Sequence, residues 1–119
     1  MPNLTADEYK AQVDAARGMY SPGSTVTLDR MSAWAEICGV YSLLWVHQLE
    51  FDRKGITPSA EALSYRTDAE DLLKSAKSKL VGFSVSSASA VTSASFASAM
   101  AYDYVQLTKY EAGLDEGGV

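Results

Sequence analysis

Hydrophobic residues recur at steps of three and four along most of the chain, which is the spacing of one face of an α-helix. The first predicted helix, residues 6–17, begins with a capping box, because Thr5 and Glu8 can each accept a hydrogen bond from the other's backbone amide. Arg17 occupies its last turn. Gly18 follows, at the position where a left-handed residue commonly ends a helix.

Pro22 and Gly23 predict a turn, and a second helix then begins at Thr25 or Thr27 and extends to about Lys54. Large side chains repeat along one face of it, namely Met31, Trp34, Cys38, Tyr41, Trp45 and Gln48 or Leu49. Further residues widen that stripe until the middle of the helix is apolar nearly all round, namely Ile37, Val40, Leu43, Leu44 and Val46. Such a helix must be covered on more than one side. We therefore expect it, with both tryptophans, at the centre of the domain or of an oligomer.

Thr57 and Pro58 predict the start of a third helix, because threonine is a good capping residue and proline suits the first helical position. Its predicted inner face carries Ala62, Tyr65 or Arg66, Ala69, Leu72, Leu73, Ala76 and Leu80, and Gly82 ends it. Acidic residues precede lysines along the remaining faces, in the order that the helix dipole favours. We interpret this charge run as a solvated outer face.

The segment from Ser86 to Met100, SSASAVTSASFASAM, leaves two interpretations open. We favour a fourth helix over about residues 88–112, because one helical stripe runs through Phe96, Met100, Tyr104, Leu107 and Glu111. Its serines compete for backbone hydrogen bonds, so the alternative is an arm that becomes ordered only against a partner. Gly113 is the predicted C-terminal cap, and residues 115–119 are predicted to be a flexible or partner-bound tail.

These patterns predict an all-α fold, a small helical bundle of three to four helices with an extended or helical C-terminal arm. A chain of 119 residues with 47% hydrophobic residues suits one domain with a modest core. We expect residues 1–82 to be a self-sufficient helical body. Residues 83–119 are then a Ser/Ala-rich arm, or a fourth helix with a flexible tail.

The net charge of the chain limits the kinds of partner that we expect it to bind. A formal net charge of −5 and a pI near 4.7 argue against wrapping nucleic acid, which depends on clustered Lys and Arg. Asp7 and Glu8 lie where a signal peptide needs positive charge, and the longest apolar stretch, residues 37–46, is too short to span a bilayer. We expect a soluble, intracellular protein with no membrane association and no specific nucleic-acid binding.

Candidate chemistry is sparse. Cys38 is the only cysteine and is predicted to be a small buried apolar residue. His47 is the only histidine, and Glu50 three residues on does not complete a metal site. The sequence carries neither a nucleophile elbow nor a glycine-rich phosphate loop. We predict no enzyme activity, no catalytic residue, no cofactor and no metal.

The C-terminal aromatic residues are the remaining functional signal. Tyrosine is enriched at protein interfaces, and this segment has little core of its own. The predicted partner interface consists of Phe96, Met100, Tyr102, Tyr104, Leu107 and Tyr110. Contacts within the chain are the alternative.

The run from Ala35 to Gly82, AEICGVYSLLWVHQLEFDRKGITPSAEALSYRTDAEDLLKSAKSKLVG, resembles the middle of small head-completion, or head-to-tail adaptor, proteins of tailed bacteriophages. The shared pattern is an apolar helix, a loop with glycine and proline, and a second helix with a closing glycine. It is carried by Leu43, Leu44, Gly55, Pro58, Tyr65, Asp68, Ala69, Leu72, Leu73 and Gly82. The Ser/Ala-rich segment departs from the family pattern, and the common N-terminal signature is missing.

The resemblance implies a structural protein of the virion that is made in the host cytoplasm. It implies a homo-oligomeric ring, a dodecamer in the adaptor case, between the portal protein and neck or tail proteins. The C-terminal segment would lie against the portal, and DNA would pass through an acidic lumen. A head-to-tail ring needs two different complementary patches on each subunit. The alternative is a small helical regulator or effector that binds one protein partner without catalysis.

Overall fold

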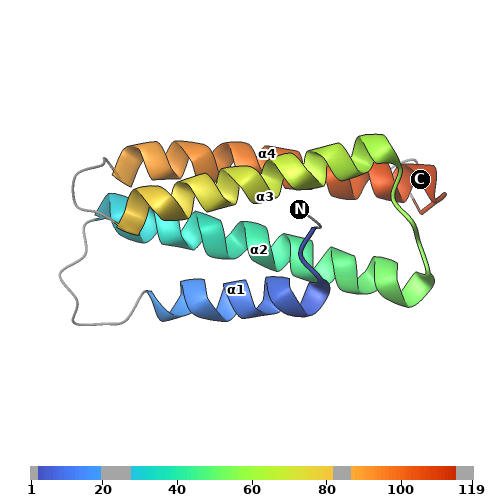
Figure 1. Cartoon of the computed structure of the whole chain (residues 1–119), viewed down its shortest axis with the longest axis horizontal. Coiled ribbons are helices and arrows are strands. Elements are labelled where there is room, and N and C mark those ends of the chain that lie inside the picture. Colours follow the sequence, from blue (N-terminus) through green and yellow to red (C-terminus); the bar gives the residue numbers. More distant parts are fainter. Residues whose placement is uncertain (1–2, 20–27, 82–86, 115–119) are drawn as a thin grey trace.

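The computed structural model describes residues 3–19, 28–81 and 87–114. They form four α-helices, namely α1 (Ala6–Gly18), α2 (Leu28–Lys54), α3 (Ala60–Val81) and α4 (Ser87–Glu111). Each helix runs antiparallel to the one before it (Figure 1). The predicted all-α bundle is confirmed, and the C-terminal segment adopts the fourth-helix alternative.

Local capping accounts for the ends of α1. The amide of Glu8 donates to Thr5 Oγ1 at 3.2 Å, and the amide of Thr5 donates to Glu8 Oε1 at 2.9 Å, so the predicted capping box is present. The prediction of a left-handed Gly18 is wrong. Gly18 is the last residue of α1, and the helix is closed by the amide of Met19, which donates to the carbonyl of Ala16 at 3.1 Å.

Among the other helix ends, two lie where the sequence predicted them and one does not. Gly55 and Gly113 have positive φ, 67° and 75°, and follow α2 and α4 as predicted. α3 begins later than predicted, because Ser59 is its cap: Ser59 Oγ accepts from the amide of Ala62 at 3.2 Å. The predicted start of the second helix, the Pro22–Gly23 turn, the end at Gly82 and the C-terminal tail lie outside the described residues.

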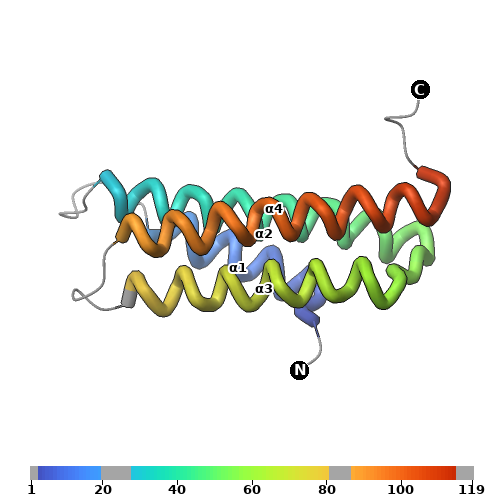
Figure 2. Tube along the Cα trace, turned by 90° about the horizontal axis from the view of Figure 1, so that it is seen from above, coloured from blue at the N-terminus to red at the C-terminus, as the bar shows by residue number. Residues whose placement is uncertain are grey.

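The order of neighbours around the bundle differs from the order in the chain. α4 packs against both α2 and α3, whereas α1 packs against α2, and α2 and α3 lie on a diagonal (Figures 1 and 2). Long side chains join α1 to α3; Lys77 Nζ, for example, donates to Gln12 Oε1 at 2.7 Å. This packing argues against the predicted division into a self-sufficient body and an arm, because α4 is the main packing partner of α3.

Alanine provides four of the eight buried residues of α4. Ala90, Ala94, Ala97 and Ala101 are completely buried, together with Tyr104. Side chains this small let the backbone of α4 come close to its neighbours. The stripe that we predicted as the main face of this helix therefore lies elsewhere, with Tyr104 as its one fully buried member.

The core of α2 also differs from the prediction. Its buried stripe consists of Ala33, Ile37, Val40, Tyr41, Leu44, Gln48 and Phe51. Trp34 and Trp45 are only half-buried, and Trp45 lies on the side covered by the short helix α1, where Lys10 Nζ is 6.0 Å from its ring centroid. Cys38 lies on the same side, and its thiol donates to the carbonyl of Val13 at 3.8 Å. The helix is covered by α1 and α4, which confirms the expectation of more than one covered side.

Candidate interaction surface

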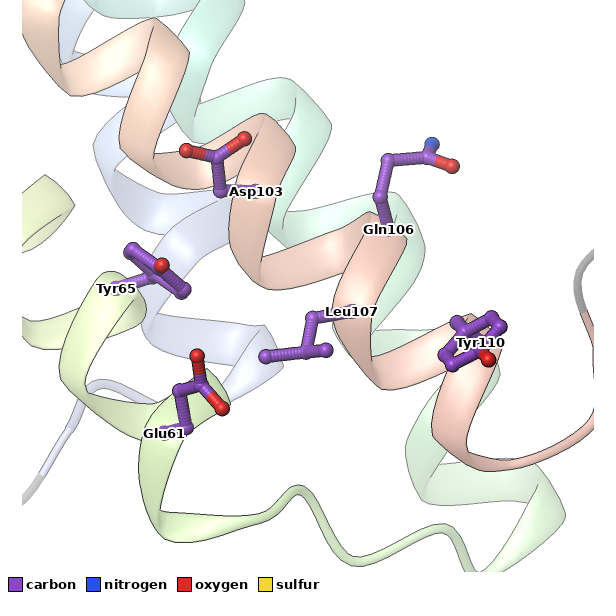
Figure 3. A pocket seen from close by; sticks show the side chains of 6 residues that line it. All are labelled: Glu61, Tyr65, Asp103, Gln106, Leu107 and Tyr110. Atoms are coloured by element: carbon purple, nitrogen blue, oxygen red, sulfur yellow. The ribbon is translucent and has the colours of Figure 1, made fainter.

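The outer surface between α3 and α4 has two hollows, which we name together the α3–α4 groove. Figure 3 shows the first, of about 410 Å³, in which the side chain of Leu107 reaches across towards Glu61 on α3. Its lining residues are Glu61, Tyr65, Asp103, Gln106, Leu107 and Tyr110. The second hollow, of about 390 Å³, is lined by Asp68, Asp71, Leu72, Phe96 and Met100.

Four of the six predicted interface residues line this groove. Phe96 and Tyr110 are 59% and 68% exposed, which is unusual for aromatic side chains of their size, and Met100 and Leu107 are half-buried. Their neighbours on α3 are Tyr65 and Leu72, both half-buried. The structure thus brings together apolar side chains from two helices on a face that no described residue covers.

Tyr102 does not belong to the groove, although it is 57% exposed. It precedes Asp103 by one residue and therefore lies about 100° away around the helix axis. An exposed tyrosine on another side of the same helix provides a matched control for any experiment on the groove.

Tyr104 is a core residue rather than a surface residue. It is fully buried, and its ring meets that of Phe51 edge to face, with centroids 5.9 Å apart. Its hydroxyl donates to Gln48 Oε1, and Gln48 Nε2 donates to Asp52 Oδ1 at 2.8 Å. Burial raises the pKa of Tyr104, so the hydroxyl stays protonated. We therefore remove it from the predicted interface.

The acidic edges of the groove were missed by sequence reasoning. Asp68 and Asp71 flank one hollow, while Glu61 and Asp103 flank the other, and all four are exposed. Within the described residues none of these carboxylates forms an ion pair. Lys79 is the next basic side chain along this face of α3, and its ammonium donates to Ser93 Oγ at 2.8 Å.

The spacing of these residues along the sequence could have indicated that they share one face of the helix. Glu61, Tyr65, Asp68 and Leu72 follow one another at steps of four, three and four, and the groove residues of α4 follow the same rhythm. Two helices with matching rows, packed antiparallel, bring the rows to one shared edge. We had placed Tyr65 or Arg66, together with Leu72, on the predicted inner face of this helix and interpreted its charged residues as a solvated outer face.

A buried polar cluster links α1 to α3. Arg66 Nε donates to Tyr9 Oη at 2.7 Å, and the guanidinium carbon lies 5.4 Å from the Tyr9 ring centroid and 5.5 Å from that of Tyr104. Glu70 accepts from the Tyr9 hydroxyl at 2.7 Å and from the Leu4 amide at 2.9 Å. These groups hydrogen-bond with one another. We therefore assign this cluster a structural role.

His47 lies where α2 contacts α4, close to charged side chains of both helices. Its Nδ1 lies 3.7 Å from Glu50 Oε1, and Glu50 also accepts from Lys54 Nζ at 2.9 Å. Burial lowers the pKa of His47, and the positive charge of Lys109 lowers it further. In the described part of the chain, no three His, Cys, Asp or Glu side chains could together hold a metal ion.

A second uncovered apolar face lies on α2, and we name it the α2 outer face. Leu28 and Val46 are 78% and 55% exposed, and Met31 is also exposed. Gly39 lies on this face, and a Cβ placed there would meet no atom within 4 Å apart from its immediate neighbours. Among the described helices, none is both long enough and apolar enough to cross a lipid bilayer.

No known family, no curated protein and no solved structure matches the chain. The resemblance to phage adaptor proteins therefore stays a prediction.

Proposed function

We propose that the chain is a non-catalytic structural subunit that functions by binding other proteins. The α3–α4 groove carries this proposal, because Phe96 and Tyr110 stand in solvent beside further apolar side chains. An aromatic side chain buries roughly 150–250 Å² in an interface, and each Å² of apolar area contributes about 25 cal/mol. Covering both rings with a partner would contribute several kcal/mol to association.

The specific form of the proposal is an adaptor ring of a tailed-phage virion, between the portal and the neck or tail. Two different uncovered faces, the α3–α4 groove and the α2 outer face, support it. In this assembly the α2 outer face contacts a neighbouring subunit, and the groove contacts the portal or a neck or tail protein. The resemblance of residues 35–82 supports the same assembly, a dodecamer, with DNA passing through its lumen.

Light scattering and negative-stain electron microscopy at about 100 µM protein test self-assembly, since association follows mass action. We expect rings. The double variant Met31→Ser/Val46→Ser, which makes the α2 outer face more polar, should lower the ring fraction at least about ten-fold, whereas Tyr102→Ser should leave it unchanged. Rings that form equally well in both variants would contradict the assignment of the α2 outer face to the ring contact.

The alternative is a small helical regulator that binds one protein partner, since the α3–α4 groove alone provides one contact surface. A chain that stays monomeric at about 100 µM, alone and in the presence of a phage portal, would favour this alternative over the ring.

A further inference from the structure

The α3–α4 groove is lined by apolar side chains of both helices and by the carboxylates of Glu61, Asp68, Asp71 and Asp103. We propose that it binds a basic amphipathic helix of a different protein. This inference rests on the proposed protein-binding function and names the chemistry of the partner that occupies this one face.

The spacing of the groove residues selects a helix as the bound element. Phe96, Met100, Asp103, Leu107 and Tyr110 follow one another at steps of four, three, four and three. This is the heptad spacing through which helices pack side by side in coiled coils. α3 provides Leu72 and Tyr65 as the opposite wall. A third helix that lies between these walls uses the helix-in-groove mode of recognition.

The length of the groove sets the length of the partner. Phe96 and Tyr110 are 14 residues apart on one straight helix, which corresponds to about 21 Å at 1.5 Å per residue. A partner helix of about four turns, with apolar residues at alternating steps of three and four, covers both hollows.

The negative charge of the groove favours a basic partner. Each hollow has two carboxylates, Asp68 and Asp71 at one and Glu61 and Asp103 at the other. Lys and Arg have apolar stems that can cross the edge of the groove while their charged ends reach carboxylates. Complementary charges of this kind raise association rates and orient the partner.

The same charges disfavour the other occupants. A second copy of this chain that used the same face would bring two sets of four carboxylates together, and like charges across an interface cost several kcal/mol. Phosphates of nucleic acid or of an anionic membrane meet the same repulsion. The two hollows and the four exposed carboxylates beside them lie at the groove, so we assign the basic helix to this face.

Three fluorescein-labelled peptides of about 14 residues test the proposal by anisotropy against the full chain. The first has leucines at helical spacing and lysines elsewhere, the second has glutamates in place of the lysines, and the third has the leucines and lysines of the first in an order without a helical stripe. We expect the first peptide to bind at least about ten-fold more tightly than either control peptide. Equal affinity of the glutamate peptide or of the scrambled peptide would overturn the proposal.

Charge-reversal variants locate the site. Asp68→Lys/Asp103→Lys should weaken binding of the first peptide at least about ten-fold, whereas Asp7→Lys/Asp14→Lys, the same change of net charge on α1, should leave it within about two-fold. Phe96→Ala should weaken binding, and Tyr102→Ala should not. Circular dichroism confirms that each variant keeps its helices. Equal losses in the two charge-reversal variants would overturn the site, and unchanged rings alongside absent peptide binding would leave the proposed function standing.

Discussion

The hydroxyl of Tyr9 donates to Glu70 Oε2 at 2.7 Å and thereby joins α1 to α3, two helices whose backbones do not pack directly against each other. The same oxygen accepts from Arg66 Nε at 2.7 Å. Burial raises the pKa of Tyr9, so the hydroxyl stays protonated and keeps donating well into the alkaline range. One phenol therefore connects a buried cation with a carboxylate.

We expect Tyr9→Phe to lower the free energy of unfolding by about 1–3 kcal/mol, because Arg66 Nε and Glu70 each lose a hydrogen-bond partner away from water. Urea denaturation followed by circular dichroism measures the change. Tyr65→Phe is the matched control, since the Tyr65 hydroxyl makes no hydrogen bond among the described residues. A Tyr65→Phe variant that loses as much stability as Tyr9→Phe would contradict this account.

Removal of residues 82–119 should abolish cooperative unfolding rather than leave a folded three-helix body. α4 supplies a face of completely buried alanines together with Tyr104, and its loss exposes the inner sides of α2 and α3. Circular dichroism of the truncated chain should show weak helicity and a broad thermal transition. A sharp transition with intact helicity would restore the self-sufficient body that we expected from the sequence.

Ala97→Leu should destabilise the protein by about 1–3 kcal/mol, because added methylene groups have no space where α4 approaches its neighbours closely. Ala97 is completely buried, whereas Ala99, two residues on, is exposed. Ala99→Leu should therefore change the free energy of unfolding by less than about 0.5 kcal/mol. Similar denaturation midpoints for the two variants would show that the inner face of α4 is not tightly packed.

The free energy of unfolding should fall as the pH drops through the ordinary pKa of histidine, 6.5, because the folded state holds the pKa of His47 below that value. The unfolded chain then takes up a proton that the folded chain does not, so acid favours unfolding. The nearby Glu50 carboxylate partly offsets this, and Lys109 strengthens it. Denaturant titrations between about pH 5.5 and 8 measure the slope.

His47→Gln should flatten the stability profile in that range. The Glu50 carboxyl also has a lowered pKa, chiefly through its hydrogen bond with Lys54, but its contribution is lost only as the pH falls towards and below 4.5. The contributions of His47 and Glu50 to stability therefore change in different pH ranges. A variant that retains the wild-type slope above about pH 5.5 would assign the effect to another group.

Helix boundaries were predictable at some local caps, although not at Gly18 or Ser59. Thr5 and Glu8 are three residues apart and satisfy each other's amides, so the sequence contains the whole motif. Gly55 ends α2 for the same kind of reason, since its φ of 67° favours glycine. Ser59 was missed because Thr57 and Pro58 form an equally good local start signal two residues earlier.

The orientation of α4 was not predictable from hydropathy. Alanine and serine differ too little in apolar area to mark an inner face, whereas Phe96 and Leu107 form a conspicuous stripe. What decides the orientation is how closely the helix can approach α2 and α3, and this depends on the absence of large side chains from its inner face. The groove depends in turn on α3 being the neighbour of α4, which no local pattern encodes.

The position of α4 also affects how the chain emerges during synthesis. It is the last of the four helices to leave the ribosome, yet α2 and α3 complete their packing on it. Translation from residue 54 to residue 111 lasts roughly 3–11 s at 5–20 residues per second, and during that time Phe51 lacks its contact with Tyr104. The nascent chain should therefore recruit a chaperone that holds apolar segments, and should fold only after the fourth helix is free of the exit tunnel.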